Sequence, residues 1–209
     1  MTATASTPFD FAPQRGQDDE LLQQIGFVPG LKELLTVRQV HALEHATVWV
    51  LSEPQLGMSD FLLGGMSTET GFYLYGDVPT AAVYRAVRIA LDRLTSGEWN
   101  LAVHPRCGTN LSVGMLMTAG LAIGVNLFLP KDPIGQLLGW GVAAATATSI
   151  APDVGAVVQK YVTTAIPFNL EIVAVRPSRD WSGRPQHFVE LRWVEAQSNV
   201  ASWNGSAHS

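Results

Sequence analysis

Two long stretches without a charged residue constrain the fold of this chain more than any other feature. The first lies between Arg106 and Lys131, and the second lies between Asp132 and Asp153. A helix needs about 20 apolar residues to cross the roughly 30 Å hydrocarbon layer of a bilayer, and both stretches reach that length. We therefore expect a transmembrane helical hairpin that occupies 111–151. Its two spans are predicted at 111–129 and 134–151.

The alternative is a pair of helices buried inside a soluble protein. The chain has 209 residues, which is the usual length of a single domain. A domain of this size can hardly surround two such helices on all sides. Only 15% of the residues are charged, whereas soluble proteins average about 25%. Both arguments favour the membrane, with the lipid bilayer as the first partner of the chain.

Overall charge and cysteine content exclude several other classes. Thirteen basic against eighteen acidic residues give a net charge of −5, so we expect no nucleic acid partner, because phosphate binding needs a basic excess. The single cysteine rules out an intramolecular disulfide. The N-terminal residues have neither a basic start nor an apolar core, and we expect no secretory signal there.

The polar sequence on both sides of the hairpin alternates helical and strand patterns, which predicts an α+β fold. We expect a small cytoplasm-facing α+β domain built around the two-helix hairpin. Its expected elements are helices at 31–51, ended by Pro54, and from Asp77 or Thr80 to Gly97, with strands at 70–75, 101–104, 170–175 and 187–194. The predicted divisions are a polar tail (1–24), an α+β region (25–110), the hairpin (111–151), a C-terminal strand hairpin completing the polar domain (152–196) and a flexible tail (197–209).

Basic residues near the span ends predict the sidedness. Arg106 and Lys160 flank the outer ends of the hairpin, and Lys131 is the only basic residue in the turn. Since basic residues accumulate on the cytoplasmic side, both polar portions are expected in the cytoplasm or the stroma of a plastid. Small residues four apart let membrane helices approach closely. The approach can occur within the hairpin, between copies of the chain or against a partner in a membrane complex. The alternative is that glycine is simply common in such helices. The glycines with this spacing are Gly120, Gly124, Gly135 and Gly139.

The segment His41-Ala42-Leu43-Glu44-His45 lies within the first predicted helix. Residues three and four apart share one helical face, so His41 and His45 can bind one zinc ion. Glu44 is placed to accept a proton from a metal-bound water. The order H-x-x-E-H is that of one class of metalloprotease. The alternative is a pair of core histidines hydrogen-bonded to a neighbouring carboxylate.

A second motif, His104-Pro105-Arg106-Cys107-Gly108-Thr109-Asn110, places a histidine and the only cysteine three residues apart. His/Cys pairs at short spacing are typical zinc ligands. The start of a membrane helix also favours a thiolate at Cys107. The alternatives are an inert buried thiol at Cys107 and a simple turn residue at His104. Together the motifs predict a shared zinc site of His41, His45, His104 and Cys107.

The paired motifs resemble those of the YqhQ-like bacterial membrane proteins, a family identified as predicted metal-dependent enzymes. From Val37 to Thr164, more than half of the chain, the sequence is more similar to a related membrane family of unknown function from cyanobacteria and plastids. There H-A-L-E-H-A-T, H-P-x-C-G-T-N and V-T-T recur. The resemblance implies a membrane protein with a metal site, and it implies no established reaction. Ala46 departs from the YqhQ-like pattern, which has a lysine there.

Three functional classes follow from these motifs. In a hydrolase, His41, His45 and either His104 or Cys107 would hold the metal, with Glu44 as general base. In a structural protein, all four ligands would close the site around zinc. In the third class no metal binds, and the protein is a subunit or assembly factor of a membrane complex. We expect a structural or subunit role, with the hydrolase as the alternative.

Overall fold

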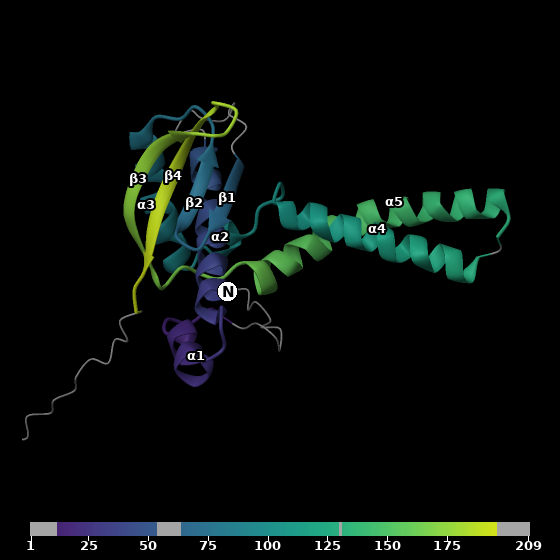
Figure 1. Cartoon of the computed structure of the whole chain (residues 1–209), viewed down its shortest axis with the longest axis horizontal. Coiled ribbons are helices and arrows are strands. Elements are labelled where there is room, and N and C mark those ends of the chain that lie inside the picture. Colours follow the sequence, from purple (N-terminus) through teal and green to yellow (C-terminus); the bar gives the residue numbers. More distant parts are fainter. Residues whose placement is uncertain (1–11, 54–63, 130, 196–209) are drawn as a thin grey trace, which may run out of the picture.

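The computed structural model describes residues 12–53, 64–129 and 131–195. An α+β domain lies at one end, and a long helical hairpin projects from it (Figure 1). The domain combines helices with one four-stranded antiparallel sheet, which confirms the predicted class. Pro54 and residues 197–209 lie outside the described residues.

Eleven elements follow one another along the described chain. The helices are α1 (Gln17–Ile25), α2 (Leu31–Leu51), α3 (Thr80–Thr95), α4 (Gly108–Phe128) and α5 (Pro133–Val158), with a 3-10 helix η2 (Trp99–Ala102) and a π-helical turn η3 (Gln159–Thr163). The strands are β1 (Gly64–Thr68), β2 (Gly71–Tyr75), β3 (Leu170–Arg179) and β4 (Pro185–Trp193).

The sheet joins sequence from both sides of the hairpin. Its strand order is β1-β2-β4-β3, with every pair antiparallel. The β2–β4 pairing sets Tyr73 opposite Phe188, so the segment before the hairpin and the segment after it form one unit. This arrangement brings the two ends of the hairpin to the same place in the domain.

Helix α2 has the predicted bounds, but it is buried over more of its surface than a single apolar stripe would require. Leu43 and Val50 are 0% and 1% exposed, whereas Leu34 near the start of the helix is 57% exposed. Helix α3 packs beside α2, and buried side chains of the sheet complete the core, with Phe72 and Val189 both at 0% exposure. The central helix is therefore enclosed by the rest of the domain.

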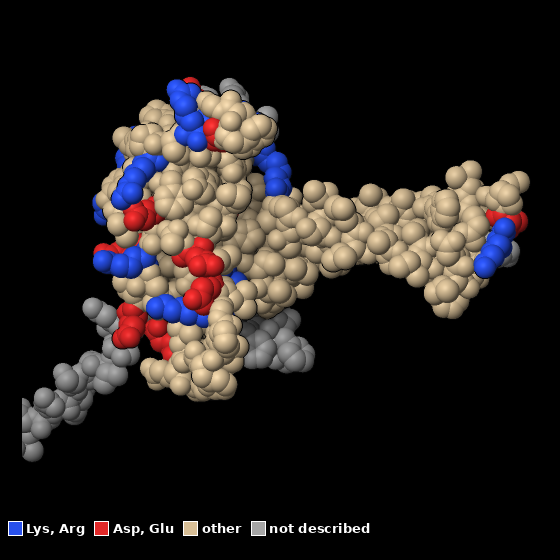
Figure 2. Space-filling model, in the orientation of Figure 1, with Lys and Arg blue, Asp and Glu red and all other residues tan. Residues whose placement is uncertain are grey.

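The hairpin has the opposite character. No residue of α4 is buried, and its lipophilic side chains point outward, with Leu116 at 74% and Phe128 at 87% exposure. Figure 2 shows no charged side chain along the hairpin on the visible face, except at its far tip. Helices Gly108–Phe128 and Pro133–Thr163 are long and apolar enough to cross a membrane, with mean hydropathies of 1.8 and 1.3.

Helix α4 begins before its predicted span, 111–129, and α5 continues well beyond the end of its own, 134–151. Helix α4 begins at Gly108, because Cys107 caps it by accepting a hydrogen bond from the Thr109 amide. Helix α5 continues beyond Asp153 to Val158 and is followed directly by η3. A charged residue ends an apolar run, but it does not end a helix.

The expected strand at 101–104 was wrong, and this segment is instead the 3-10 helix Trp99–Ala102, because the chain turns there toward α4. Most of α1 falls within the segment described from the sequence as a polar tail, 1–24. The Asp18 and Asp19 side chains of α1 accept hydrogen bonds from Gln39 and Asn169. This polar network attaches α1 to α2 and to the start of β3. Strand β1 was not predicted, since two of its five residues are glycine.

Candidate metal centre

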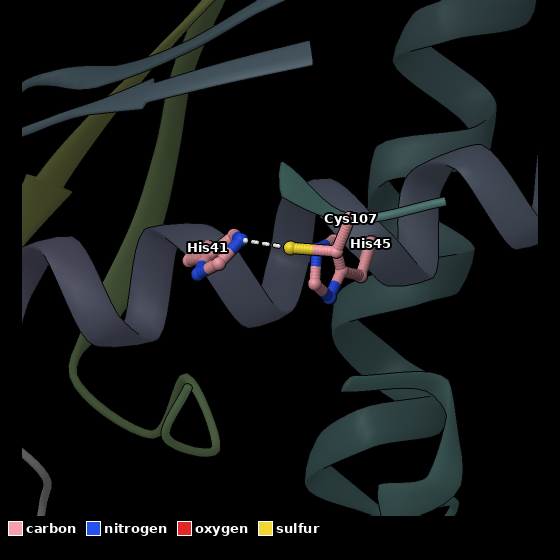
Figure 3. Close-up of side chains that lie close together, drawn as sticks. All are labelled: His41, His45 and Cys107. Carbon is pink, nitrogen blue, oxygen red and sulfur yellow. Dashed lines mark hydrogen bonds between the residues drawn. The ribbon is translucent and has the colours of Figure 1, made fainter. Parts of the chain in front are cut away.

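The candidate metal centre lies where the hairpin joins the domain. His41 and His45 project from the middle of α2, and Cys107 is the residue that precedes α4. Figure 3 shows the Cys107 sulfur directed between the two imidazoles. The three ligand atoms all lie within 4.8 Å of one another. We call these three residues the His/His/Cys group.

Contacts within the group fix its geometry. The Nε2 atom of His41 lies 3.3 Å from the Sγ atom of Cys107. The two imidazole rings are one helical turn apart, with centroids separated by 4.3 Å. The spacing of four residues on α2 therefore places both rings beside a single sulfur atom, as the sequence motif predicted.

Backbone carbonyl groups hold both rings in one orientation. The Nδ1 atom of His41 is 3.0 Å from the Thr163 carbonyl oxygen, and the Nδ1 atom of His45 is 2.7 Å from that of Ala102. An Nδ1–H donated to a carbonyl leaves the Nε2 lone pair free, and metal-binding histidines are usually oriented in this way. Thr163 belongs to η3 and Ala102 to η2, so both irregular turns serve the group.

The electrostatics of the group favour a thiolate. Burial raises the pKa of the Cys107 thiol, but hydrogen bonds from His41, His45 and Thr109 outweigh it and lower the pKa to about 5. Burial also lowers the pKa of His41, yet its hydrogen bond with Cys107 raises the net value above the ordinary one. A metal ion would have to displace the proton that this pair shares, so its binding would depend on pH.

His104, the fourth predicted ligand, stands outside the His/His/Cys group. Its ring centroid is 5.8 Å from that of His45 and 5.1 Å from that of Trp49. Its Nδ1 atom accepts a hydrogen bond from the Arg106 amide at 3.3 Å. Burial, followed by Coulombic interactions with His45 and Arg106, lowers the pKa of His104 to about 4, so its ring is neutral near pH 7.

Glu44 faces the same cavity as the two histidines. The Ser67 hydroxyl donates to its carboxylate at 2.6 Å. A side chain at Gly65 would collide with this carboxylate, so the glycine of β1 makes room for it. Burial raises the pKa of Glu44, and the Ser67 hydrogen bond together with the charges on His45 and His41 offsets part of that rise.

A cavity of about 380 Å³ connects these groups. Its wall includes the His/His/Cys group, Glu44 and residues of β1. The side chains that complete the lining are those of Val37, Val48, Met66, Ser67, His104 and Arg106. The cavity is large enough for a water molecule and part of a small organic group.

Polar side chains at the base of the hairpin support the centre, and of these Gln159 was not predicted from the sequence. Gln159 accepts a hydrogen bond from the His104 amide at 2.8 Å and donates to Asn110 at 2.7 Å. Asn110 in turn donates to the Pro105 carbonyl. A buried amide after an apolar run is a signal that could have identified Gln159. Nothing in the sequence marked Ser67 or the carbonyl of Ala102.

The donor set fits zinc. Two imidazoles and one thiolate are borderline to soft ligands, which suit zinc better than magnesium or calcium. The two Nδ1 hydrogen bonds supply the orientation that such a site requires. The described residues thus contain three convergent ligands and a carboxylate in one cavity.

Comparisons with known proteins identify the family. The family described as "Domain of unknown function (DUF6391)" matches residues 36–175. An uncharacterized protein of Picosynechococcus sp. (strain ATCC 27264 / PCC 7002 / PR-6) is 57% identical over 193 residues, which cover 90% of this chain and 94% of that protein. No solved structure matches the chain. The expected similarity to a cyanobacterial family of unknown function is confirmed, while the relation to YqhQ-like proteins stays a prediction.

Proposed function

We propose that this chain, which belongs to the DUF6391 family, is a membrane-anchored, zinc-dependent hydrolase. The observation that carries the proposal is the meeting of three ligands and one carboxylate in a single cavity, His41, His45 and Cys107 with Glu44. Three protein ligands and an open position are typical of catalytic zinc sites, whereas structural sites have four ligands. The sequence favoured a structural or subunit role with the hydrolase as the alternative, and the proposal reverses that preference.

Each residue has a distinct role in this proposal. His41, His45 and Cys107 would hold the ion, which supplies a Lewis acid that makes water a nucleophile near neutral pH. Glu44 would accept the proton of the attacking water and pass it to the leaving group. Its raised pKa brings the carboxyl closer to the pH at which a general base works best. Ser67, Thr163 and Ala102 act as positioning residues.

The position of the centre ties the chemistry to a membrane surface. Cys107 directly precedes α4, and Thr163 ends the helical run that begins at Pro133. If α4 and α5 cross a bilayer, the centre lies at its polar boundary. The basic flanks favour the cytoplasmic or stromal side for that boundary. Extraction of membranes with carbonate should leave the chain in the pellet, and its release would contradict membrane anchoring.

Metal analysis of the full chain in detergent, purified without chelator, tests the site. We expect one zinc per wild-type chain, none in Cys107→Ala or His41→Ala, and one in the matched control Glu44→Gln. Circular dichroism must show that each variant is folded. A folded wild-type chain free of zinc would contradict the proposal.

A closed structural site is the second candidate, because the ring of His104 is a neighbour of His45. Cobalt substitution distinguishes the two sites. Acetohydroxamate should change the visible cobalt spectrum of an open site, since it can occupy the free position. A spectrum that does not respond, together with zinc loss in His104→Ala, would favour the structural role.

A further inference from the structure

Strand β1 forms one wall of the site cavity and also one edge of the sheet. Four of its residues, Gly64 to Ser67, line the cavity together with the His/His/Cys group. The strand order β1-β2-β4-β3 leaves β1 with a single strand neighbour among the described residues. An edge strand directs every second N–H and C=O away from its neighbour. Among the described residues, no strand pairs with the outer edge of β1, so this wall of the cavity has backbone groups available beside the proposed metal centre.

The two glycines of β1 differ in their surroundings, and only Gly64 has open space beside it. Gly65 faces the Glu44 carboxylate, and Ser67 donates to it. A Cβ at Gly64 would meet only one atom, at 3.8 Å on Tyr75, so the fold itself does not require glycine there. A glycine within a strand often marks the close approach of another backbone. Met66, at 49% exposure, adds an apolar contact at the mouth of the cavity.

The charge of the lining argues against a phosphate-bearing ligand. Arg106 is the one basic side chain of the Lys or Arg type among the described lining residues, and the Glu44 carboxylate shares that lining. Recognition of phosphate usually involves several cationic or N–H donors. A neutral peptide backbone, in contrast, needs only the hydrogen bonds that a strand edge provides.

We propose that the substrate is an extended polypeptide segment next to a membrane-spanning helix, and that it pairs with β1 as an added strand. The inference rests on the proposed hydrolase function and specifies its substrate class. Pairing with β1 carries one peptide bond of the substrate past Glu44 and the His/His/Cys group. Because the site lies at the base of the hairpin, the cleaved bond would lie near the bilayer surface.

The reaction in this proposal is hydrolysis of a peptide bond by one water molecule. The water oxygen bonds to the carbonyl carbon, and one of its protons moves to Glu44. The C–N bond then breaks, and Glu44 returns the proton to the leaving nitrogen. The second proton of the water stays on the new carboxyl group, so the products are a carboxylic acid and an amine, and no oxidant or reductant takes part.

Amide hydrogen exchange on the zinc-loaded Glu44→Gln chain in lipid nanodiscs tests the pairing without turnover. The probe is a pool of synthetic peptides, each with one hydrophobic membrane-spanning helix followed by ten randomised residues. We expect exchange of the outward-facing β1 amides to slow at least tenfold. Amides of β3, the opposite edge strand, serve as the internal control and should not change.

A second measurement examines the backbone pairing itself. N-methylation at every second position of the tightest-binding peptide should abolish protection of β1, while methylation at the intervening positions should not. Unchanged β1 exchange with the whole peptide pool would overturn the inference. A second result would also overturn the inference: zinc-loaded wild type releases fatty acid from phosphatidylglycerol vesicles but leaves every peptide intact. That result would still support a hydrolase. A folded chain without zinc would instead contradict the proposed function.

Discussion

The α+β domain and the helical hairpin have apolar side chains in common, but they expose them very differently. Phe72 in the domain has 0% exposure, whereas Phe128 at the end of α4 has 87%. Between residues 108 and 163 the sequence has four charged residues, Lys131, Asp132, Asp153 and Lys160, and on the face seen in Figure 2 the hairpin shows charge only at its far tip. The domain buries its large apolar side chains, whereas the hairpin exposes an apolar surface of the kind that suits lipid.

This difference explains the position of the candidate metal centre. Burial within the domain gives the two histidines fixed partners, while the start of α4 supplies the sulfur. Neither region alone holds all three ligands. Within the described residues, the histidines of the domain and the cysteine at the base of the hairpin meet at this junction.

The largest expected effect contrasts two phenylalanines. Phe72→Ala should destabilise the domain by about 3–5 kcal/mol, because it removes a large side chain from a packed core. Phe128→Ala should change the free energy of unfolding of the domain by less than about 0.5 kcal/mol, since it lies outside that core. Denaturant unfolding followed by near-ultraviolet circular dichroism measures both. Equal losses would contradict the distinction between the regions.

A charge on the hairpin should matter only if lipid surrounds it. Leu116→Arg places a cation in the middle of α4 and should disfavour insertion by about 2.5–3.5 kcal/mol. The matched variant Leu34→Arg lies on the domain surface at 57% exposure and should have little effect. A glycosylation-based insertion assay gives the comparison. Equal insertion of both variants would show that α4 does not sit in lipid.

The sequence predicted these two regions well because each follows a simple rule. The uncharged run between Arg106 and Lys131 sufficed for the first hairpin helix, and the spacing of apolar residues sufficed for α2. Irregular elements were missed, since η2 and η3 depend on contacts with distant residues. The Thr163 carbonyl reaches His41 across 122 positions of sequence, and no local pattern reveals such a contact.

The candidate site was predicted in part for the same reason. Helical spacing fixed His41, Glu44 and His45 on one face, whereas the orientations of His104 and Cys107 depend on a turn. In that turn only Cys107 reaches the two imidazole nitrogens. The sequence therefore identified the residues but left the number of converging ligands open.

The reactivity of the Cys107 thiol should reflect the hydrogen bonds that lower its pKa at the junction. Its pKa of about 5 is below that of an ordinary thiol, so alkylation of the metal-free chain by iodoacetamide should persist to pH 6 and decline only near pH 5. Zinc should protect the thiol. Because the unfolded thiol binds more protons, this group stabilises the fold above its unfolded pKa, and that contribution is lost as the pH falls through 5. An alkylation midpoint near pH 8.5 would contradict the hydrogen-bonded thiolate.

The smallest effect distinguishes the glycines of the hairpin. Nothing lies within 4 Å of an added Cβ at Gly120 or Gly124, whereas one at Gly139 would lie 2.6 Å from Leu129 and 2.7 Å from Val125. Gly120→Ala should be neutral or stabilise α4 by up to about 1 kcal/mol. Gly139→Ala should loosen the hairpin by a similar amount. Thermal unfolding in detergent measures both, and destabilisation by Gly120→Ala would indicate that this face contacts another copy or partner.

X-ray absorption at the zinc edge of the purified full chain measures the ligand set of the proposed site. We expect one sulfur at about 2.3 Å, two nitrogens at about 2.0–2.1 Å and at least one oxygen. The sulfur signal should vanish in Cys107→Ala together with the bound metal. A folded chain that shows no zinc edge, or a shell of three nitrogens and one sulfur without oxygen, would contradict an open site formed by His41, His45 and Cys107.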